Sequence, residues 1–115
     1  MLPEPDRERL VQIKDAAYSI ADFTAGLSEE TFRDRKLVQH AVTNCLHIII
    51  EAASRVSDET RQQHPEIEWD VIRGMRNRLA HAYFDINLGI VWQSTTVDVP
   101  RLLESVHRIL EDEGP

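Results

Sequence analysis

Apolar residues recur at three- and four-residue spacings in four stretches of the chain, a pattern typical of amphipathic helices. The first stretch follows Asp6, which we expect to cap the helix, and ends at Gly26. The longest, from about Lys36 to Val56, is apolar over most of its circumference, which indicates a central helix. Its polar residues share one line, which either meets water or faces a polar cavity: Lys36, His40, Asn44, His47 and Glu51.

A third helix is predicted after the charged connector that Pro65 closes. It begins near Glu66 to Asp70 and carries an apolar stripe, and its helical pattern fades after Ala80. Four main helices, with one or two short ones and no convincing strand, predict an all-α helical bundle.

The start of the last helix is less regular. Residues 94–99 have strand-like propensity but no partner strand, so we predict a loop or fraying helix there. Asp98 is placed to cap the last helix, with Pro100 in its first turn.

The length of 115 residues fits one domain, residues 1–115. A net charge of −7 argues against broad electrostatic capture of nucleic acid, so any contact with RNA must be local. Cys45 is the only cysteine, which excludes an internal disulfide. Because the sequence shows no basic leader and no long apolar run, we expect a soluble, cytoplasmic protein without a membrane partner.

Ile72 to Phe84 stands out from this acidic background, because it holds three arginines, an asparagine, a histidine and a tyrosine but no carboxylate. Arg76 and His81 are five positions apart, which on a continuous helix is roughly 140° around the axis. Either the helix ends near Ala80 and a short extended exit gathers Arg76, His81 and Tyr83, or a second subunit completes the site.

Such a set suits RNA cleavage without a metal ion or cofactor. His81 would move the proton when the 2′-hydroxyl of the substrate attacks the adjacent phosphate, and Arg76 would hold the phosphate oxygens. Asn77 could orient the phosphate or the histidine, and Tyr83 could position a base or donate a proton from its phenol. Arg73 lies on the same flank as Arg76. From residue types alone, the alternative is that the arginines are solvated or ion-paired and that the histidine caps a helix.

A metal site on the longest helix is disfavoured. His40, His47 and Glu51 share one line, but spacings of seven and eleven residues put them roughly 10 and 16 Å apart along the axis. One ion cannot be reached across those separations.

Arg76, four intervening residues, His81, Ala82 and Tyr83 resemble the Arg-x4-His-x-Tyr motif of HepT-like toxin ribonucleases in the HEPN superfamily. Residues 69–85 are similar to the signature block of that family. The resemblance implies a homodimeric helical bundle, a metal-independent endoribonuclease with catalytic Arg76 and His81, and an RNA substrate, for which tRNA is one candidate. It also implies a partner antitoxin, a minimal nucleotidyltransferase of MntA type, which transfers AMP to Tyr83.

The central helix departs from the family pattern. Asn44-Cys45 and Ile50-Glu51-Ala52 stand where family members often carry Arg-Asn and Gly-Glu-Ala. Together with the net charge of −7, this favours an alternative function: a catalytically weak helical module that binds a nucleotidyltransferase and is modified by it.

Overall fold

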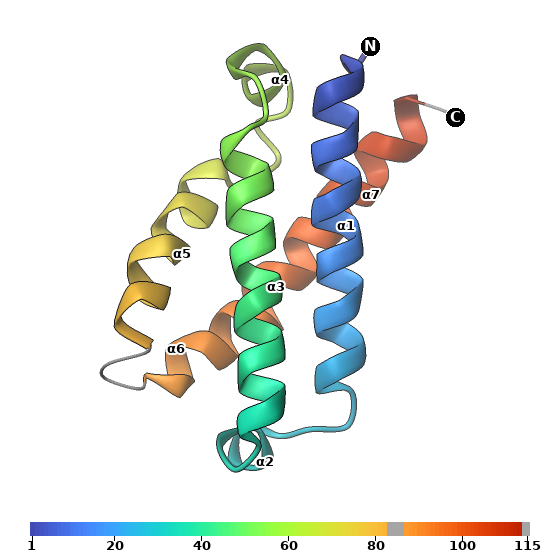
Figure 1. The fold of residues 1–115 in the computed structure, drawn as a ribbon. Coiled ribbons are helices and arrows are strands. Elements are labelled where there is room, and N and C mark those ends of the chain that lie inside the picture. The colour runs from blue at the N-terminus through green and yellow to red at the C-terminus, as the bar shows by residue number, and fades with distance from the viewer. Residues whose placement is uncertain (83–86, 114–115) are drawn as a thin grey trace.

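The computed structural model describes residues 1–82 and 87–113, with residues 80–82 described by their backbone alone. Two long helices, α1 (Glu4–Thr24) and α3 (Lys36–Ser54), pack side by side, and α7 (Val99–Glu113) crosses behind them (Figure 1). Helix α5 (Trp69–Ala82) packs against α3 on the side away from α1. Within the described residues no strand forms, so the predicted all-α fold with four main helices is confirmed.

The core lies where the apolar stripes of the long helices meet. Leu46 and Ile49 of α3 are fully buried, as are Leu10 and Ile13 of α1. Burying each of these side chains contributes about 1.5–3 kcal/mol. The central position predicted for α3 is therefore confirmed. Among residues 1–82 and 87–113, no helix is both long enough and apolar enough to cross a membrane.

Asp6 does not cap α1, so that prediction is wrong. The helix begins at Glu4 with Pro3 at the N-cap position, and Asp6 is buried in the first turn. Its carboxylate accepts hydrogen bonds from the N–H and hydroxyl of Ser57, at 3.0 and 2.6 Å, and from the Thr60 hydroxyl at 2.5 Å. Donors more than fifty residues away therefore bind a carboxylate that local spacing had assigned to the helix end.

Gly26 ends α1 as predicted. The helix stops at Thr24, and Gly26 adopts a φ of +76°, which allows the Leu27 N–H to donate to the Thr24 carbonyl at 3.0 Å. A side chain is disfavoured in this left-handed region, so glycine is the residue that fits the turn.

Three short helices occur within the described residues, where one or two were expected: α2 (Glu29–Arg33), α4 (Asp58–Gln63) and α6 (Leu88–Gln93). Each has a side-chain cap, because Ser28, Ser57 and Asn87 each accept a hydrogen bond from the backbone N–H three residues later. A single cap of this kind is enough to stabilise one turn in a connector.

The segment that was predicted as a loop or fraying helix is helical, so that prediction is wrong. Helix α6 continues through a π-helical turn, Ser94–Asp98, directly into α7. In a regular α-helix the ring of Pro100 would clash with the carbonyl of Thr96, four residues earlier. We infer that the wider turn accommodates the proline without breaking the helix.

Asp98 lies inside this π-helical turn and is not the cap of the last helix, so the predicted cap is wrong. Its carboxylate lies 3.7 Å from the Arg78 guanidinium of α5, and both side chains are mostly shielded from water. An ion pair between helices therefore replaces the local cap.

Candidate active site

Helix α5 is oriented by its buried stripe. The residues of the stripe are at most 3% exposed: Ile72, Met75 and Leu79. Trp69 begins the helix, and its indole Nε1–H donates to the His64 carbonyl at 3.1 Å. Burial of the stripe leaves Arg73 and Arg76 exposed along the flank of the helix, as the helical spacing predicts.

Arg76 reaches from α5 to the central helix. Its guanidinium lies 3.7 Å from the carboxylate of Glu51 on α3, and Glu51 also lies 3.1 Å from Arg55. Both members of the Arg76–Glu51 pair are more than half exposed, and such pairs contribute little to stability. The pair therefore places the Arg76 guanidinium beside α3 without holding it tightly.

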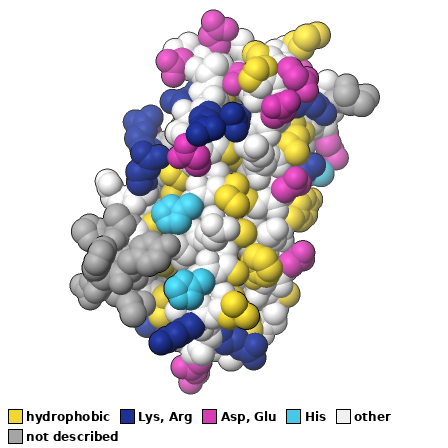
Figure 2. Space-filling view, viewed as in Figure 1, with side chains coloured by type: hydrophobic (Ala, Val, Ile, Leu, Met, Phe, Trp, Pro, Cys, Tyr) yellow, Lys and Arg dark blue, Asp and Glu magenta, His cyan; other side chains and the backbone are white. Residues whose placement is uncertain are grey.

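A groove beside Arg76 is bordered by one end of the polar line of α3. It has a volume of about 590 Å³ and is lined by residues of α1, α3 and α5, among them Arg9, His47, Glu51 and Arg76. Figure 2 shows histidines and hydrophobic side chains on the face formed by α3 and α1. The polar line is exposed throughout and therefore meets water, and its last two members also border the groove.

A metal site on this line finds no support in the part of the chain that the structure describes. Residues 1–82 and 87–113 contain no group of three or more histidine, cysteine, aspartate or glutamate side chains arranged to hold an ion.

The end of α5 differs from the prediction. The helix runs through Ala82 and includes His81, so the expected exit near Ala80 is wrong. Backbone hydrogen bonding continues past the point at which the sequence pattern fades. The positions of Arg76 and His81 are therefore roughly 140° apart around one helix axis. Tyr83 lies outside the described residues.

The arginines of the basic segment differ in their surroundings. Arg73 is 71% exposed and lies 3.6 Å from Asp70, whereas Arg78 is 34% exposed in its pair with Asp98 and also donates to the Val71 carbonyl at 3.4 Å. Asn77 is exposed on the same helix. The ion-pair alternative thus holds for all three arginines, and Arg73 and Arg76 are the more exposed of the three.

Two contributors to the site were not predicted as site residues. Arg9 borders the groove from α1, and Glu51 is the partner of Arg76. Glu51 could have been identified from the sequence, because it ends the polar line of α3. Arg9 could not have been identified in this way, because its position beside the groove depends on how α1 packs against α3.

The chain was compared with known proteins. The profile of the family described as "Ribonuclease HepT-like" matches residues 13–109. A "Probable ribonuclease HepT" of Thermococcus cleftensis is 34% identical over 96 residues, which are 84% of this chain and 87% of the relative. A "Putative RNase" of Caldanaerobacter subterraneus subsp. tengcongensis is 32% identical over 111 residues, 96% of each chain. The comparison with solved structures gave no significant match. The family profile covers most of the chain, including the whole of α5 with Arg76 and His81, and the chain therefore belongs to the HepT-like ribonuclease family.

Proposed function

We propose that this protein is a metal-independent endoribonuclease that acts as the toxin of a toxin–antitoxin pair. The observation that carries the proposal is the Arg76, His81 and Tyr83 motif in a chain of the HepT-like ribonuclease family. The exposure of Arg76 beside the α3 groove supports it, because an accessible guanidinium can hold two phosphate oxygens at once.

The proposed reaction uses the nucleophile of the substrate itself. The 2′-oxygen forms a bond to phosphorus, the bond from phosphorus to the 5′-oxygen breaks, and the products carry a 2′,3′-cyclic phosphate and a 5′-hydroxyl. One proton must leave the 2′-hydroxyl and one must reach the departing 5′-oxygen. Histidine suits both transfers near neutral pH, and Arg76 would stabilise the charge that builds on the phosphorane oxygens.

A homodimer would supply the second motif histidine that one chain lacks. Two proton transfers call for an acid and a base, and each chain carries one His81 in the motif. Two chains with their α5 helices facing one cleft would place Arg76 of one protomer near His81 of its partner. The helical continuity of α5 through Ala82 favours this arrangement, because the two positions diverge within one chain.

Cleavage of RNA in EDTA tests the enzyme activity. The wild type should cut total or transfer RNA, and His81→Ala and Arg76→Ala should each reduce the rate by about 10²-fold or more. His107→Ala is the matched control for the histidine, since His107 is about half exposed on α7 and its imidazole lies 3.1 Å from Glu111. Equal cleavage by wild type, His81→Ala and Arg76→Ala would reveal a contaminating nuclease and remove the support for catalysis.

The proposed regulation is AMP transfer to Tyr83 by a minimal nucleotidyltransferase antitoxin of MntA type. The added phosphodiester would bring a negative charge to the segment that carries Arg76 and His81, where it would compete with RNA for the same cations. Intact mass after incubation with the partner and ATP should rise by one or more AMP units. A mass increment that persists in Tyr83→Phe would rule out Tyr83 as the acceptor.

A second candidate function is an interaction module that binds and is modified by the nucleotidyltransferase but cleaves RNA weakly or not at all. The net charge of −7 and the pairing of Arg76 with Glu51 favour it. It predicts AMP transfer to Tyr83 together with no His81-dependent cleavage.

A further inference from the structure

A second cavity lies on the other flank of Arg76, between the C-terminal end of α3, α4 and the start of α5. It has a volume of about 370 Å³, and its wall includes three arginines and an indole: Arg61, Arg73, Arg76 and Trp69. None of the described residues that line it is acidic. In a protein with a net charge of −7, this concentration of cations makes the cavity, which we call the arginine cleft, a local site for an anion.

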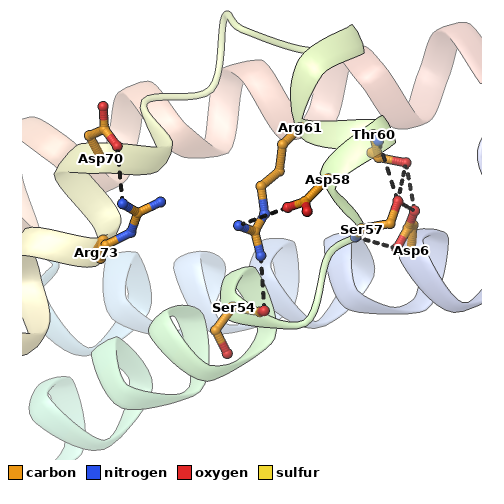
Figure 3. A network of polar contacts seen from close by, with 8 residues as sticks. All are labelled: Asp6, Ser54, Ser57, Asp58, Thr60, Arg61, Asp70 and Arg73. Atoms are coloured by element: carbon orange, nitrogen blue, oxygen red, sulfur yellow. Dashed lines mark hydrogen bonds and ion pairs between the residues drawn. The ribbon is translucent and has the colours of Figure 1, made fainter.

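Arg61 is held in place from two sides. One guanidinium nitrogen donates to the Ser54 carbonyl at the end of α3 at 2.9 Å, and another lies 3.6 Å from Asp58 (Figure 3). Asp6 fixes the first turn of α4 through Ser57 and Thr60, so the helix that carries Arg61 is anchored to α1. The position of this cation is therefore set before any ligand binds, which lowers the entropic cost of binding.

Arg61 also has an unused donor. Its Nε is buried and has no hydrogen-bond partner among the described residues. Buried polar groups without a partner are rare in folded proteins, and each calls for an explanation. This nitrogen is shielded from solvent, so it does not by itself define where a ligand sits in the cleft.

The aromatic part of the wall is fixed as well. The hydrogen bond from the Trp69 Nε1–H to the His64 carbonyl sets the orientation of an indole that remains partly exposed. Ile50 and Ile72 complete the apolar side of the cleft. A flat aromatic surface next to arginines is the combination that binds a base and its phosphate in single-stranded nucleic acid.

The carboxylates that neutralise these arginines can be displaced. Asp58 and Asp70 lie 3.6 Å from Arg61 and Arg73 and line a neighbouring hollow outside the arginine cleft. Both aspartates are almost fully exposed, and exposed pairs at such distances are weak. A phosphate can therefore compete for both arginines.

We propose that the arginine cleft binds one nucleotide of single-stranded RNA next to the phosphate that is cleaved at Arg76. Its phosphate would contact Arg61 and Arg73, and its base would stack on Trp69. The volume lies near the lower end of small-molecule sites, about 300–1,000 Å³, and so fits a single nucleotide. The inference rests on the proposed ribonuclease function, because Arg76 borders both the cleft and the groove of the candidate active site.

Binding in a cleavage-deficient background tests the cleft. The probe is a fluorescein-labelled single-stranded pentaadenylate, titrated by anisotropy against full-length His81→Ala protein. Trp69→Leu should weaken binding by about five-fold or more, and Trp69→Phe should restore most of it because phenylalanine keeps an aromatic face. Each of Arg61→Gln and Arg73→Gln should lower the slope of log Kd against log salt by about 0.7, the value for one phosphate contact.

Two controls separate the cleft from general charge and from unfolding. Arg101→Gln removes a cation that is 66% exposed and lies 3.7 Å from Glu68, a close match to Arg73, and it should leave the slope unchanged. A pentameric abasic phosphodiester should bind Trp69→Leu as well as it binds the parent protein. Circular dichroism confirms the folding of each variant. If loss of the Ser54 contact unfolds Arg61→Gln, the salt slope is tested with Arg73→Gln alone.

The outcomes distinguish the two proposals. If wild type cleaves RNA but Trp69→Leu and Arg73→Gln bind the pentaadenylate as tightly as Arg101→Gln does, the cleft proposal is overturned and the ribonuclease stands. If binding depends on Trp69 and Arg73 but wild type does not cleave, the nucleotide site stands and the ribonuclease proposal fails.

Discussion

Replacement of the buried residue Asp6 should destabilise the fold. The residue is 3% exposed, and its carboxylate accepts three hydrogen bonds from Ser57 and Thr60. Burial by itself would raise the pKa of Asp6, but the hydrogen bonds from Ser57 and Thr60, with the positive charge of Arg61, outweigh it and lower the pKa below 3.8. The folded state therefore stabilises the ionised form.

The expected magnitude follows from these contacts. A hydrogen bond to a charged group contributes about 1.5–3 kcal/mol net, and a buried donor left without an acceptor costs about 1–3 kcal/mol. Asp6→Ala removes the shared acceptor, but the hydroxyls of Ser57 and Thr60 lie 3.2 Å apart and can partly satisfy each other. We therefore expect a loss of about 3 kcal/mol rather than the full sum. Asp6→Asn keeps the shape, but it removes the charge and replaces one accepting oxygen with an NH2 donor, which should cost about 1–2 kcal/mol.

Urea denaturation followed by circular dichroism measures both losses. With a slope of about 1–3 kcal/mol per molar urea, Asp6→Ala should lower the midpoint by roughly 1–3 M. Because the pKa of Asp6 is lower in the folded state than in the unfolded state, the charge stabilises the protein above the unfolded value. The difference between wild type and Asp6→Asn should be complete at about pH 6 and should shrink as the pH falls below 3.8 and through the folded pKa.

Asp15→Asn is the matched control, because it removes the same charge from an exposed position on α1 and should change stability by less than about 0.5 kcal/mol. The reasoning is refuted if Asp6→Asn matches wild type near neutrality, or if its deficit is the same in acid as near neutrality.

Three further predictions concern other parts of the fold. Gly26→Ala should cost about 1–2 kcal/mol in urea denaturation, because φ is +76° at that position; an unchanged midpoint would contradict it. Arg78→Met and Asp98→Asn should each destabilise by about 1 kcal/mol or more, and the double variant by less than the sum, if the pair at 3.7 Å links α5 to the π-helical turn. Burial raises the pKa of the Cys45 thiol, so a thiol reagent should modify it slowly in the native protein and rapidly in denaturing urea.

Local spacing predicted the long helices well. Apolar residues recur with the helical period in α1, α3, α5 and α7. These same residues are buried and form the core. Gly26 was also predictable, because a turn with positive φ selects for glycine at that point in the chain. For the site, the motif located Arg76 and His81 on α5, and the apolar stripe placed Arg76 on an exposed flank.

The residues that were predicted wrongly are those with competing distant partners. Asp6 and Asp98 both have the chemistry of a helix cap, but Ser57 with Thr60 in one case and Arg78 in the other bind the carboxylate instead. A capping rule considers only neighbours along the chain, whereas a carboxylate binds whichever donors the packing brings to it.

What the sequence alone determined is therefore the set of helices, their buried faces and the family motif, because each depends on contacts within a few turns. Only the tertiary structure decided that α6 and α7 join through a π-helical turn, that α5 continues past Ala80, and that Glu51 meets Arg76. It also brought Arg61 and Trp69 from separate segments into one cleft with Arg73. These features depend on the packing of helices against one another, which no local spacing encodes.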